Sequence, residues 1–336
     1  LMCAPRLQPL RIGPITLDNP VILAPMAGVT DLPTRRLVRR FGAGLVVSEM
    51  IASQAMIRRN SQTLRMAAHE SDDAPMAVQL AGSDPVAMAE AARLNEDMGA
   101  AIVDINMGCP VRKVALKSES GAALMKDEVL AGRVMEAVVR AVGLPVTVKM
   151  RMGWDHASLN APRLAHIAQE SGVRLVTVHG RTRNQMYGGR ADWGFIGTVK
   201  QAVSIPVVGN GDVESVDDAS RLLELSGADG VMIGRGTYGR PWLCGQVAHF
   251  LATGERRPDP DLAALYALVL EHFDALLDHY GPLSGVRNAR KHLAWYSRGL
   301  PGSAEFRADV NRLGDADQVR EALARFYGPL IEKAAA

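Results

Sequence analysis

The stretch Leu175-Val176-Thr177-Val178-His179 is a short, β-branched, apolar run that ends in a polar residue. Runs of this kind occur eight times between residues 21 and 234, about 30 residues apart, and a helix-like segment follows each of them. Apolar runs without polar alternation are typical of parallel strands that are buried on both faces. The pattern therefore predicts an α/β chain built from eight strand–helix units.

The number of units decides between two α/β architectures. The other seven predicted strands lie at residues 21–26, 45–50, 76–80, 102–106, 146–150, 207–210 and 230–234. Eight units in roughly 250 residues favour a (β/α)8 TIM barrel. The alternative, a doubly wound sheet, usually has fewer strands and a Gly-rich dinucleotide turn after the first one. Here the first strand ends Ala24-Pro25-Met26-Ala27-Gly28, without that turn, so we expect the barrel.

The strand–helix pattern stops near the charged, turn-rich stretch of residues 253–260. Beyond it, apolar residues recur every three or four positions, which predicts helices at about residues 262–280, 286–298 and 317–333. We therefore expect two domains. Residues 1–255 form the catalytic barrel, and residues 256–336 form a small C-terminal all-helical domain of three or four helices.

The composition excludes several classes of protein. The 336 residues include 38 Lys and Arg against 36 Asp and Glu, a net charge of +2, so the chain is no polycation. The three cysteines, Cys3, Cys109 and Cys244, form no disulfide framework and fit a reducing cytoplasm. No stretch has the length and apolarity of a membrane span, and the start has no signal-peptide pattern. We expect a cytoplasmic protein.

Polar residues stand at the carboxyl ends of the predicted strands, where barrel enzymes carry their catalytic groups. A Lys or Asn inside an apolar strand is costly without a partner, so such residues at strand ends indicate a ligand site. These residues are Gln79, Asn106, Lys149, Arg151, His179, Arg181, Asn210, Asp212 and Arg235.

The residue types at these ends suggest a ligand with two parts. Asn210-Gly211-Asp212 and Gly234-Arg235-Gly236 follow the last two strands, where many barrels bind phosphate. Lys149 and His179 offer donors to a second part, and flavin mononucleotide (FMN) has both a phosphate and a ring whose edge becomes anionic on reduction. Gln79 is a candidate donor to the polar edge of the ring. A sugar-phosphate substrate with a Schiff base on Lys149, as in aldolases, is the competing interpretation.

Cys109 follows the fourth predicted strand, in Asn106-Met107-Gly108-Cys109-Pro110. No Cys-x-x-Cys or His–Cys spacing is present, so we expect no metal site. A free thiol is mostly protonated at neutral pH and can donate a proton as a general acid. We therefore expect Cys109 to be catalytic, and Cys244, in an apolar segment, to be a small buried hydrophobe.

Several motifs together resemble the tRNA-dihydrouridine synthases, from about Pro9 to the C-terminal helices. They are Pro25-Met26-Ala27-Gly28-Val29-Thr30-Asp31, Asp104-Ile105-Asn106-Met107-Gly108-Cys109-Pro110, His179-Gly180-Arg181-Thr182, Asn210-Gly211-Asp212 and Gly239-Arg240-Pro241-Trp242. The segment Arg290-Lys291-His292-Leu293-Ala294-Trp295-Tyr296 resembles the B subgroup of the bacterial enzymes. The chain departs from many relatives at Ala115 and at Ser118-Glu119-Ser120, in the loop after Cys109.

The resemblance implies that the chain reduces the C5–C6 double bond of a D-loop uridine in tRNA, with position 17 favoured by the B subgroup. In this family NADPH reduces FMN, the flavin N5 passes hydride to C6, and a cysteine, matched by Cys109, protonates C5. Asn106 is expected against the flavin ring or the target base. The FMN contacts of the family match Pro25, Met26, Ala27, Gln79, Lys149, His179, Asn210, Gly211, Asp212, Gly234 and Arg235.

The enzyme must take its target base out of the stack and hold the surrounding RNA by its phosphates. From Asp259 onward the chain has eleven acidic and nine basic residues, so RNA binding depends on local stripes rather than on total charge. No obligate protein partner is expected. The basic residues expected to contact tRNA are Arg151 and Arg181 on the strand ends and Arg287, Arg290 and Lys291 at helical spacing in the tail.

Two other functions remain open on the sequence. A small-molecule flavin barrel of the dihydroorotate or dihydropyrimidine dehydrogenase type shares the flavin residues but does not need the basic helical tail. An RNA-binding module with a vestigial barrel needs the tail and no flavin.

Overall fold

The computed structural model describes residues 8–70, 73–117 and 119–336, with Lys117 described by its backbone alone. Cys3 and Ser118 lie outside the described residues. The described chain divides into two compact units. The residues up to Gly236 form one unit together with Leu243–Arg256, and Thr237–Trp242 form the other together with Arg257–Ala336. A short segment before Leu243 therefore packs with the tail, which the sequence analysis did not predict.

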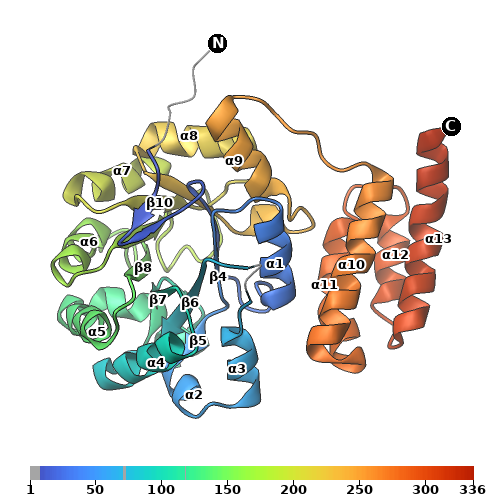
Figure 1. Ribbon diagram of the computed structural model, residues 1–336. Helices are drawn as coiled ribbons and strands as arrows, with labels where there is room; N and C mark the ends of the chain where they lie inside the picture. Colours follow the sequence, from blue (N-terminus) through green and yellow to red (C-terminus); the bar gives the residue numbers. More distant parts are fainter. Residues whose placement is uncertain (1–7, 71–72, 118) are drawn as a thin grey trace. The chain divides into compact units, whose positions relative to one another are not determined.

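Eight parallel strands of the described chain close into a barrel, so the predicted (β/α)8 TIM barrel is confirmed (Figure 1). β3 pairs with β4, β4 with β6, each later strand with the next, and β11 closes the ring on β3. Each strand lies on one of the predicted apolar runs. The strands are β3 (Val21–Leu23), β4 (Leu45–Val47), β6 (Met76–Ala81), β7 (Ile102–Met107), β8 (Val146–Arg151), β9 (Leu175–His179), β10 (Val207–Asn210) and β11 (Gly230–Ile233).

Helices on the outside of the barrel connect consecutive strands (Figure 1). Several begin at an N-cap whose side-chain oxygen accepts from a backbone N–H of the first turn, as Asp31, Asp127 and Ser215 do. These caps fix where each strand-end loop stops. The helices are α1 (Leu32–Arg40), α4 (Pro85–Asp97), α5 (Glu128–Ala141), α6 (Ala161–Glu170), α7 (Trp193–Ala202), α8 (Val216–Ser226) and α9 (Leu243–Thr253).

The structure adds short elements that the sequence did not predict. β1 (Arg11–Ile12) and β2 (Ile15–Thr16) form an antiparallel hairpin before the barrel. The remaining elements lie between the barrel strands or after the last of them. They are β5 (Ile51–Ala52), α2 (Ser53–Ile57), α3 (Ser61–Ala67), the π-helix η1 (Lys113–Lys117), and the 3₁₀-helices η2 (Gly121–Lys126) and η3 (Arg235–Thr237).

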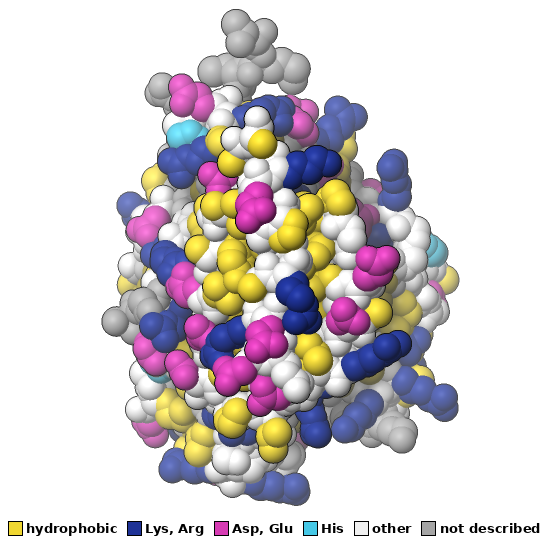
Figure 2. All heavy atoms as spheres, turned by 90° about the vertical axis from the view of Figure 1, so that its right-hand side faces the viewer, with side chains coloured by type: hydrophobic (Ala, Val, Ile, Leu, Met, Phe, Trp, Pro, Cys, Tyr) yellow, Lys and Arg dark blue, Asp and Glu magenta, His cyan; other side chains and the backbone are white. Residues whose placement is uncertain are grey.

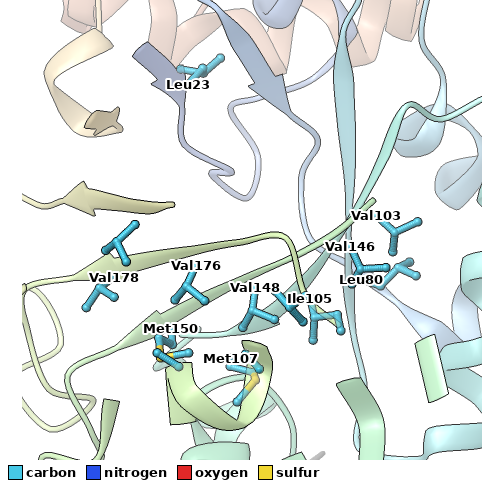
Figure 3. Packing of buried hydrophobic residues seen from close by; sticks show 14 of the residues in the cluster. Leu23, Leu80, Val103, Ile105, Met107, Val146, Val148, Met150, Val176 and Val178 are labelled. Carbon is cyan, nitrogen blue, oxygen red and sulfur yellow. The ribbon is translucent and has the colours of Figure 1, made fainter. Parts of the chain in front are cut away.

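The barrel is filled and wrapped by aliphatic side chains (Figure 3). Leu80, Ile105, Val148 and Val178, from four neighbouring strands, are fully buried. This burial explains why the strand sequences are continuous apolar runs. A polar residue inside such a run is therefore a candidate for a functional role.

The second unit contains α10 (Leu262–Tyr280), α11 (Pro282–Tyr296), α12 (Ser303–Val310) and α13 (Ala316–Ala335), so the predicted helical C-terminal region is confirmed. Gly281, at φ +82°, separates α10 from α11, a backbone conformation that glycine adopts without strain. The rings of Phe306 and Phe326 stack at 4.4 Å between centroids and pack α12 against α13. Among the described residues, no helix combines the length and apolarity needed to cross a membrane.

Candidate active site

The strand register brings the predicted site residues together at the carboxyl end of the barrel. Asn106 on β7 lies opposite Lys149 on β8, and His179 on β9 lies opposite Asn210 on β10. Arg151, two residues beyond Lys149, pairs with His179. Residues that are about 100 positions apart in sequence therefore share one rim.

The Cys109 thiol is held at the end of β7 by a tight turn. Asn106 Oδ1 accepts hydrogen bonds from the backbone N–H of Cys109 at 2.9 Å and of Gly108 at 3.1 Å. On the other side Gly121, at φ +59°, packs so closely that a Cβ would lie 2.9 Å from the Cys109 carbonyl oxygen. The backbone that carries the thiol is thus fixed from two directions.

Burial raises the pKa of the Cys109 thiol, while the positive charges of Arg151 and Lys149 oppose that rise without cancelling it. The thiol is half-buried and carries its proton at neutral pH. This state suits a proton donor rather than a nucleophile.

Lys149 is half-buried at the rim beside Asn106. Burial, reinforced by the neighbouring Arg151, lowers the pKa of Lys149 to about 8. Within the described part of the chain, its amine makes no hydrogen bond or ion pair. Asp104 is close enough to favour the charged amine but makes no ion pair with it, so the amine is suited to an electron-rich group of a ligand.

His179 is neutral in the structure, since burial and four nearby cations, Lys149 and Arg151 among them, hold its pKa well below the ordinary value. Its Nε2 lies 3.2 Å from a guanidinium nitrogen of Arg181. A guanidinium can only donate, so Nε2 is the acceptor and Nδ1 carries the proton. His179 therefore offers one N–H donor at the rim.

Arg151 and Arg181, expected to contact RNA phosphates, are instead 2% exposed and hold the rim together. Arg151 donates from Nε to the carbonyl oxygen of Gly108 at 2.8 Å, and from Nη1 to those of Thr182 and Met186. Its Nε–Gly108 bond secures the turn that carries the thiol. Their burial leaves little guanidinium surface for a phosphate group, and direct contact of either residue with RNA stays a prediction.

The turns after β10 and β11 pack against each other and form one corner of the rim. Gly211 (φ +119°) and Asp212 (φ +56°) have positive φ, and no hydrogen bond from their backbone N–H groups is present among the described residues. Gly236 packs against this turn, with Val213 O only 2.2 Å from where a Cβ would be. The Arg235 side chain is half-exposed beside it. Free N–H groups and one cation suit an anion.

The loop after β3 presents Pro25, Met26 and Ala27 at the rim. The Met26 carbonyl oxygen accepts from the N–H groups of Val29 and Thr30, both at 3.0 Å, and the Thr30 hydroxyl accepts from the Met26 N–H. The buried Glu49 carboxylate accepts from the Gly28 N–H. Thr30 and Glu49 support this loop, and the sequence analysis gave neither of them a role in the site.

Gln79 lies deeper than expected. It is 1% exposed, its Nε2 donates to Asp104 at 2.7 Å, and its Oε1 accepts from Asn106 Nδ2 at 2.8 Å. Asp104 was missed, although an acid inside the apolar run Ile102-Val103-Asp104-Ile105 was visible in the sequence. Tyr187 was missed as well; its ring, 52% exposed, lies under the guanidinium groups of Arg151 and Arg235.

The basic stripe of the helical unit is only partly exposed. Arg287 is exposed on α11, whereas Arg290 donates from Nη2 to the Leu313 carbonyl oxygen at 2.9 Å and is half-buried. Lys291 is also half-buried. Trp295 is stacked on Tyr238 of the same unit at 3.9 Å between ring centroids.

Charges of both signs are interspersed on the face shown in Figure 2, around a cluster of apolar side chains. This mixture matches the net charge of +2 and leaves no large field of one sign on that face. Among the described residues, no group of three His, Cys, Asp or Glu side chains is arranged to hold a metal ion.

Comparison with known proteins gives consistent results over nearly the whole chain. A family model described as dihydrouridine synthase matches residues 22–328. A probable tRNA-dihydrouridine synthase of Rickettsia bellii is 56% identical over 325 residues, covering 96% of this chain and 99% of the relative. The tRNA-dihydrouridine synthase B of Xanthomonas axonopodis pv. citri is 50% identical over 318 residues, covering 95% of each chain.

One solved structure gives an independent view of the architecture. A complex of 2-naphthoyl-CoA reductase superposes with a TM-score of 0.57 at 14% identity. The match covers 73% of this chain and 52% of that one. At this identity the likeness concerns the barrel fold alone.

Proposed function

The chain belongs to the dihydrouridine synthase family, and we propose that it reduces the C5–C6 double bond of a D-loop uridine in tRNA, with FMN as cofactor and NADPH as reductant. The observation that carries the proposal is the protonated thiol of Cys109 on the rim, beside the charges of Lys149 and Arg151. An acid and a buried cation at one rim are what the reduction of a polarised double bond requires.

The rim fits FMN in two places. The unused N–H groups of Gly211 and Asp212, with the Arg235 cation, suit the phosphate. We assign Gly234 and Asn210 to the walls of this corner, since Asn210 Nδ2 donates to the Met232 carbonyl oxygen at 2.9 Å and ties the two turns together. The Asp212 carboxylate is neutralised by Arg181, so it does not repel an anion there.

The other place is the ring. The Lys149 amine and the Nδ1–H of His179 are donors for the edge that becomes anionic on reduction. Pro25, Met26 and Ala27 stand on the adjoining loop as backbone and apolar contacts. When bound, FMN supplies the hydride for C6 of the uracil ring, and NADPH restores it.

Cys109 acts as the acid. With its pKa raised by burial, the Sγ–H bond is intact at neutral pH, and the proton passes to C5 as the C5–C6 double bond is reduced. The resulting thiolate is stabilised by Lys149 and Arg151 until it regains a proton from solvent. Asn106 holds the turn beneath the thiol and keeps one amide hydrogen for the flavin or the base.

We propose that tRNA binding depends chiefly on the exposed Arg287, with the half-buried Lys291 in support, and that the reaction takes place in the cytoplasm. Because phosphate contacts set RNA affinity, binding should weaken as salt rises. Position 17 of the D-loop is the proposed target, from the likeness to the B-type enzymes.

The test is direct. The purified protein should be yellow with FMN, and with NADPH and unmodified tRNA it should form dihydrouridine at position 17, measured by nucleoside mass spectrometry. Reduction of free pyrimidines without any dihydrouridine in tRNA would favour the small-molecule oxidoreductase instead. A colourless protein that binds tRNA without reaction would favour an RNA-binding module.

A further inference from the structure

Asp104 is a buried acid on the central strand of the site. It lies two residues before Asn106 on β7, so both side chains project from the same face of the strand. Asp104 is 5% exposed, and the proposed mechanism gives it no part. A carboxylate in such a position needs a reason, because burying it is costly.

Both carboxylate oxygens accept hydrogen bonds from the neighbouring strands. Thr147 Oγ1 on β8 donates to Oδ1 at 2.5 Å, and Gln79 Nε2 on β6 donates to Oδ2 at 2.7 Å. The register places the three residues side by side across β6, β7 and β8. Burial raises the pKa of the Asp104 carboxyl, while the hydrogen bonds from Thr147 and Gln79 and the charge of Lys149 favour its ionised form. The ionised carboxylate can only accept hydrogen bonds, so Gln79 turns its NH₂ group toward Asp104.

This choice of direction is passed on to the catalytic turn. With its NH₂ group toward Asp104, Gln79 presents Oε1 to Asn106, and Asn106 Nδ2 donates a hydrogen bond to this oxygen at 2.8 Å. Asn106 then has only Oδ1 left for the turn, where it accepts from the N–H groups of Gly108 and Cys109. If the chain of amides were reversed, Asn106 would place an N–H donor against these two donors.

We propose that Asp104 is a positioning residue for proton transfer: its carboxylate fixes the direction of the Gln79 and Asn106 amides and thereby holds Cys109 where it protonates the uridine. The inference rests on the proposed acid role of Cys109. It assigns Asp104 no contact with substrate or cofactor.

The variant Asp104→Asn keeps the shape and removes the acceptor-only character, because an amide can face Gln79 with either end. The flavin of the purified holoenzyme is first reduced by NADPH and then mixed with unmodified tRNA. We expect reduction by NADPH to change less than threefold and tRNA-dependent reoxidation to slow about tenfold or more, the scale of one buried hydrogen bond. Thr147→Val removes the other hydrogen bond to Asp104 and leaves the direction of the Gln79 and Asn106 amides unchanged. It should therefore slow reoxidation less.

Two further variants separate positioning from simple loss of structure. In a Cys109→Ala background, Asp104→Asn should add no further slowing to the residual formation of dihydrouridine, followed over hours by mass spectrometry. Asp104→Asn combined with Gln79→Glu exchanges the carboxylate and the amide and keeps the net charge. Because a carboxylate at position 79 only accepts hydrogen bonds, Asn106 must again turn its NH₂ group toward that position. This exchange should recover most of the tRNA-dependent rate, per bound flavin, that Asp104→Asn loses.

The outcomes discriminate between two failures. If the wild-type protein forms no dihydrouridine in tRNA, the proposed function is wrong. If the wild type is active, three outcomes overturn the inference. Asp104→Asn slows the reaction equally with and without Cys109, Asp104→Asn has no effect, or the double variant with Gln79→Glu is as slow as Asp104→Asn alone.

Discussion

Arg181 and Asp212 form an ion pair of 2.8 Å between Nη2 and Oδ2 that joins the ends of β9 and β10. Arg181 also donates to the carbonyl oxygens of Gly188 and Gly189, and Asp212 accepts from the Ala191 N–H at 2.7 Å. The pair therefore holds the loop after β9 against the turn after β10, which we assign to the FMN phosphate. The pair thus supports the turn between these two strand ends, although the residue types suggested RNA contact.

The first prediction is that Arg181→Ala weakens FMN binding and lowers stability by about 1–3 kcal/mol, because the carbonyl oxygens of Gly188 and Gly189 and the partly exposed Asp212 carboxylate lose this hydrogen-bond donor. The free energy of unfolding from urea titrations and the FMN dissociation constant check it. The dependence of tRNA affinity on salt should keep its slope, since no phosphate contact is lost. A slope reduced by about one unit would instead restore the original assignment to RNA binding.

The barrel was predictable because its strands are buried on both faces, which favours continuous apolar runs such as Val21-Ile22-Leu23. The helical tail was predictable for a similar reason, since one apolar face must pack at a period of 3.6 residues. The short elements β5, α2 and α3 were not, because runs of two to seven residues carry no clear period.

The site was predictable as a set of strand ends, because parallel strands deliver their carboxyl ends to one rim. What the sequence could not give was the direction of each side chain. Arg151 and Arg287 are the same residue type, yet one holds a turn by bonds to backbone carbonyl oxygens and the other is exposed on a helix. Such differences depend on tertiary contacts between segments that are distant in sequence.

The second prediction concerns Cys109→Ala. Flavin content and flavin reduction by NADPH should be retained, while uridine reduction falls by about 10²–10⁴-fold, the usual contribution of a general acid. Cys244→Ala is the matched control, because burial raises the pKa of that thiol to about 12 and it has no access to substrate. This control should keep full turnover with some loss of stability. Equal turnover of Cys109→Ala and the wild type would remove the acid assignment.

The third prediction is a pH dependence of FMN binding. Lys149 loses its charge in the free protein as pH rises through about 8, whereas a hydrogen bond to the electron-rich edge of the bound flavin ring would keep it protonated to higher pH. FMN should therefore bind with constant affinity below pH 8 and more weakly above it, approaching tenfold per pH unit. Quenching of FMN fluorescence gives the dissociation constant. Lys149→Met should bind more weakly at pH 7 and show no such slope, and a flat wild-type profile between pH 7 and 9.5 would contradict the assignment.

The fourth prediction separates two arginines of one helix, one turn apart on α11. Arg287 is exposed, so Arg287→Gln should reduce the slope of log affinity for tRNA against log salt by about 0.7–0.9 and leave stability unchanged. Arg290 is tied to the Leu313 carbonyl oxygen, so Arg290→Gln should cost about 1–3 kcal/mol of stability. Arg325→Gln removes an equally exposed charge from α13 and serves as the control.

Filter binding at several salt concentrations and thermal unfolding of the same three variants decide the matter, because charge and packing affect different observables. A phosphate contact changes the salt slope without changing the unfolding midpoint, since an exposed side chain stabilises nothing in the free protein. Loss of a packed guanidinium lowers the unfolding midpoint and leaves the salt slope unchanged. If Arg287→Gln and Arg325→Gln share the wild-type slope, the exposed end of the α11 stripe does not contact tRNA, and the phosphate contacts must come from other exposed cations.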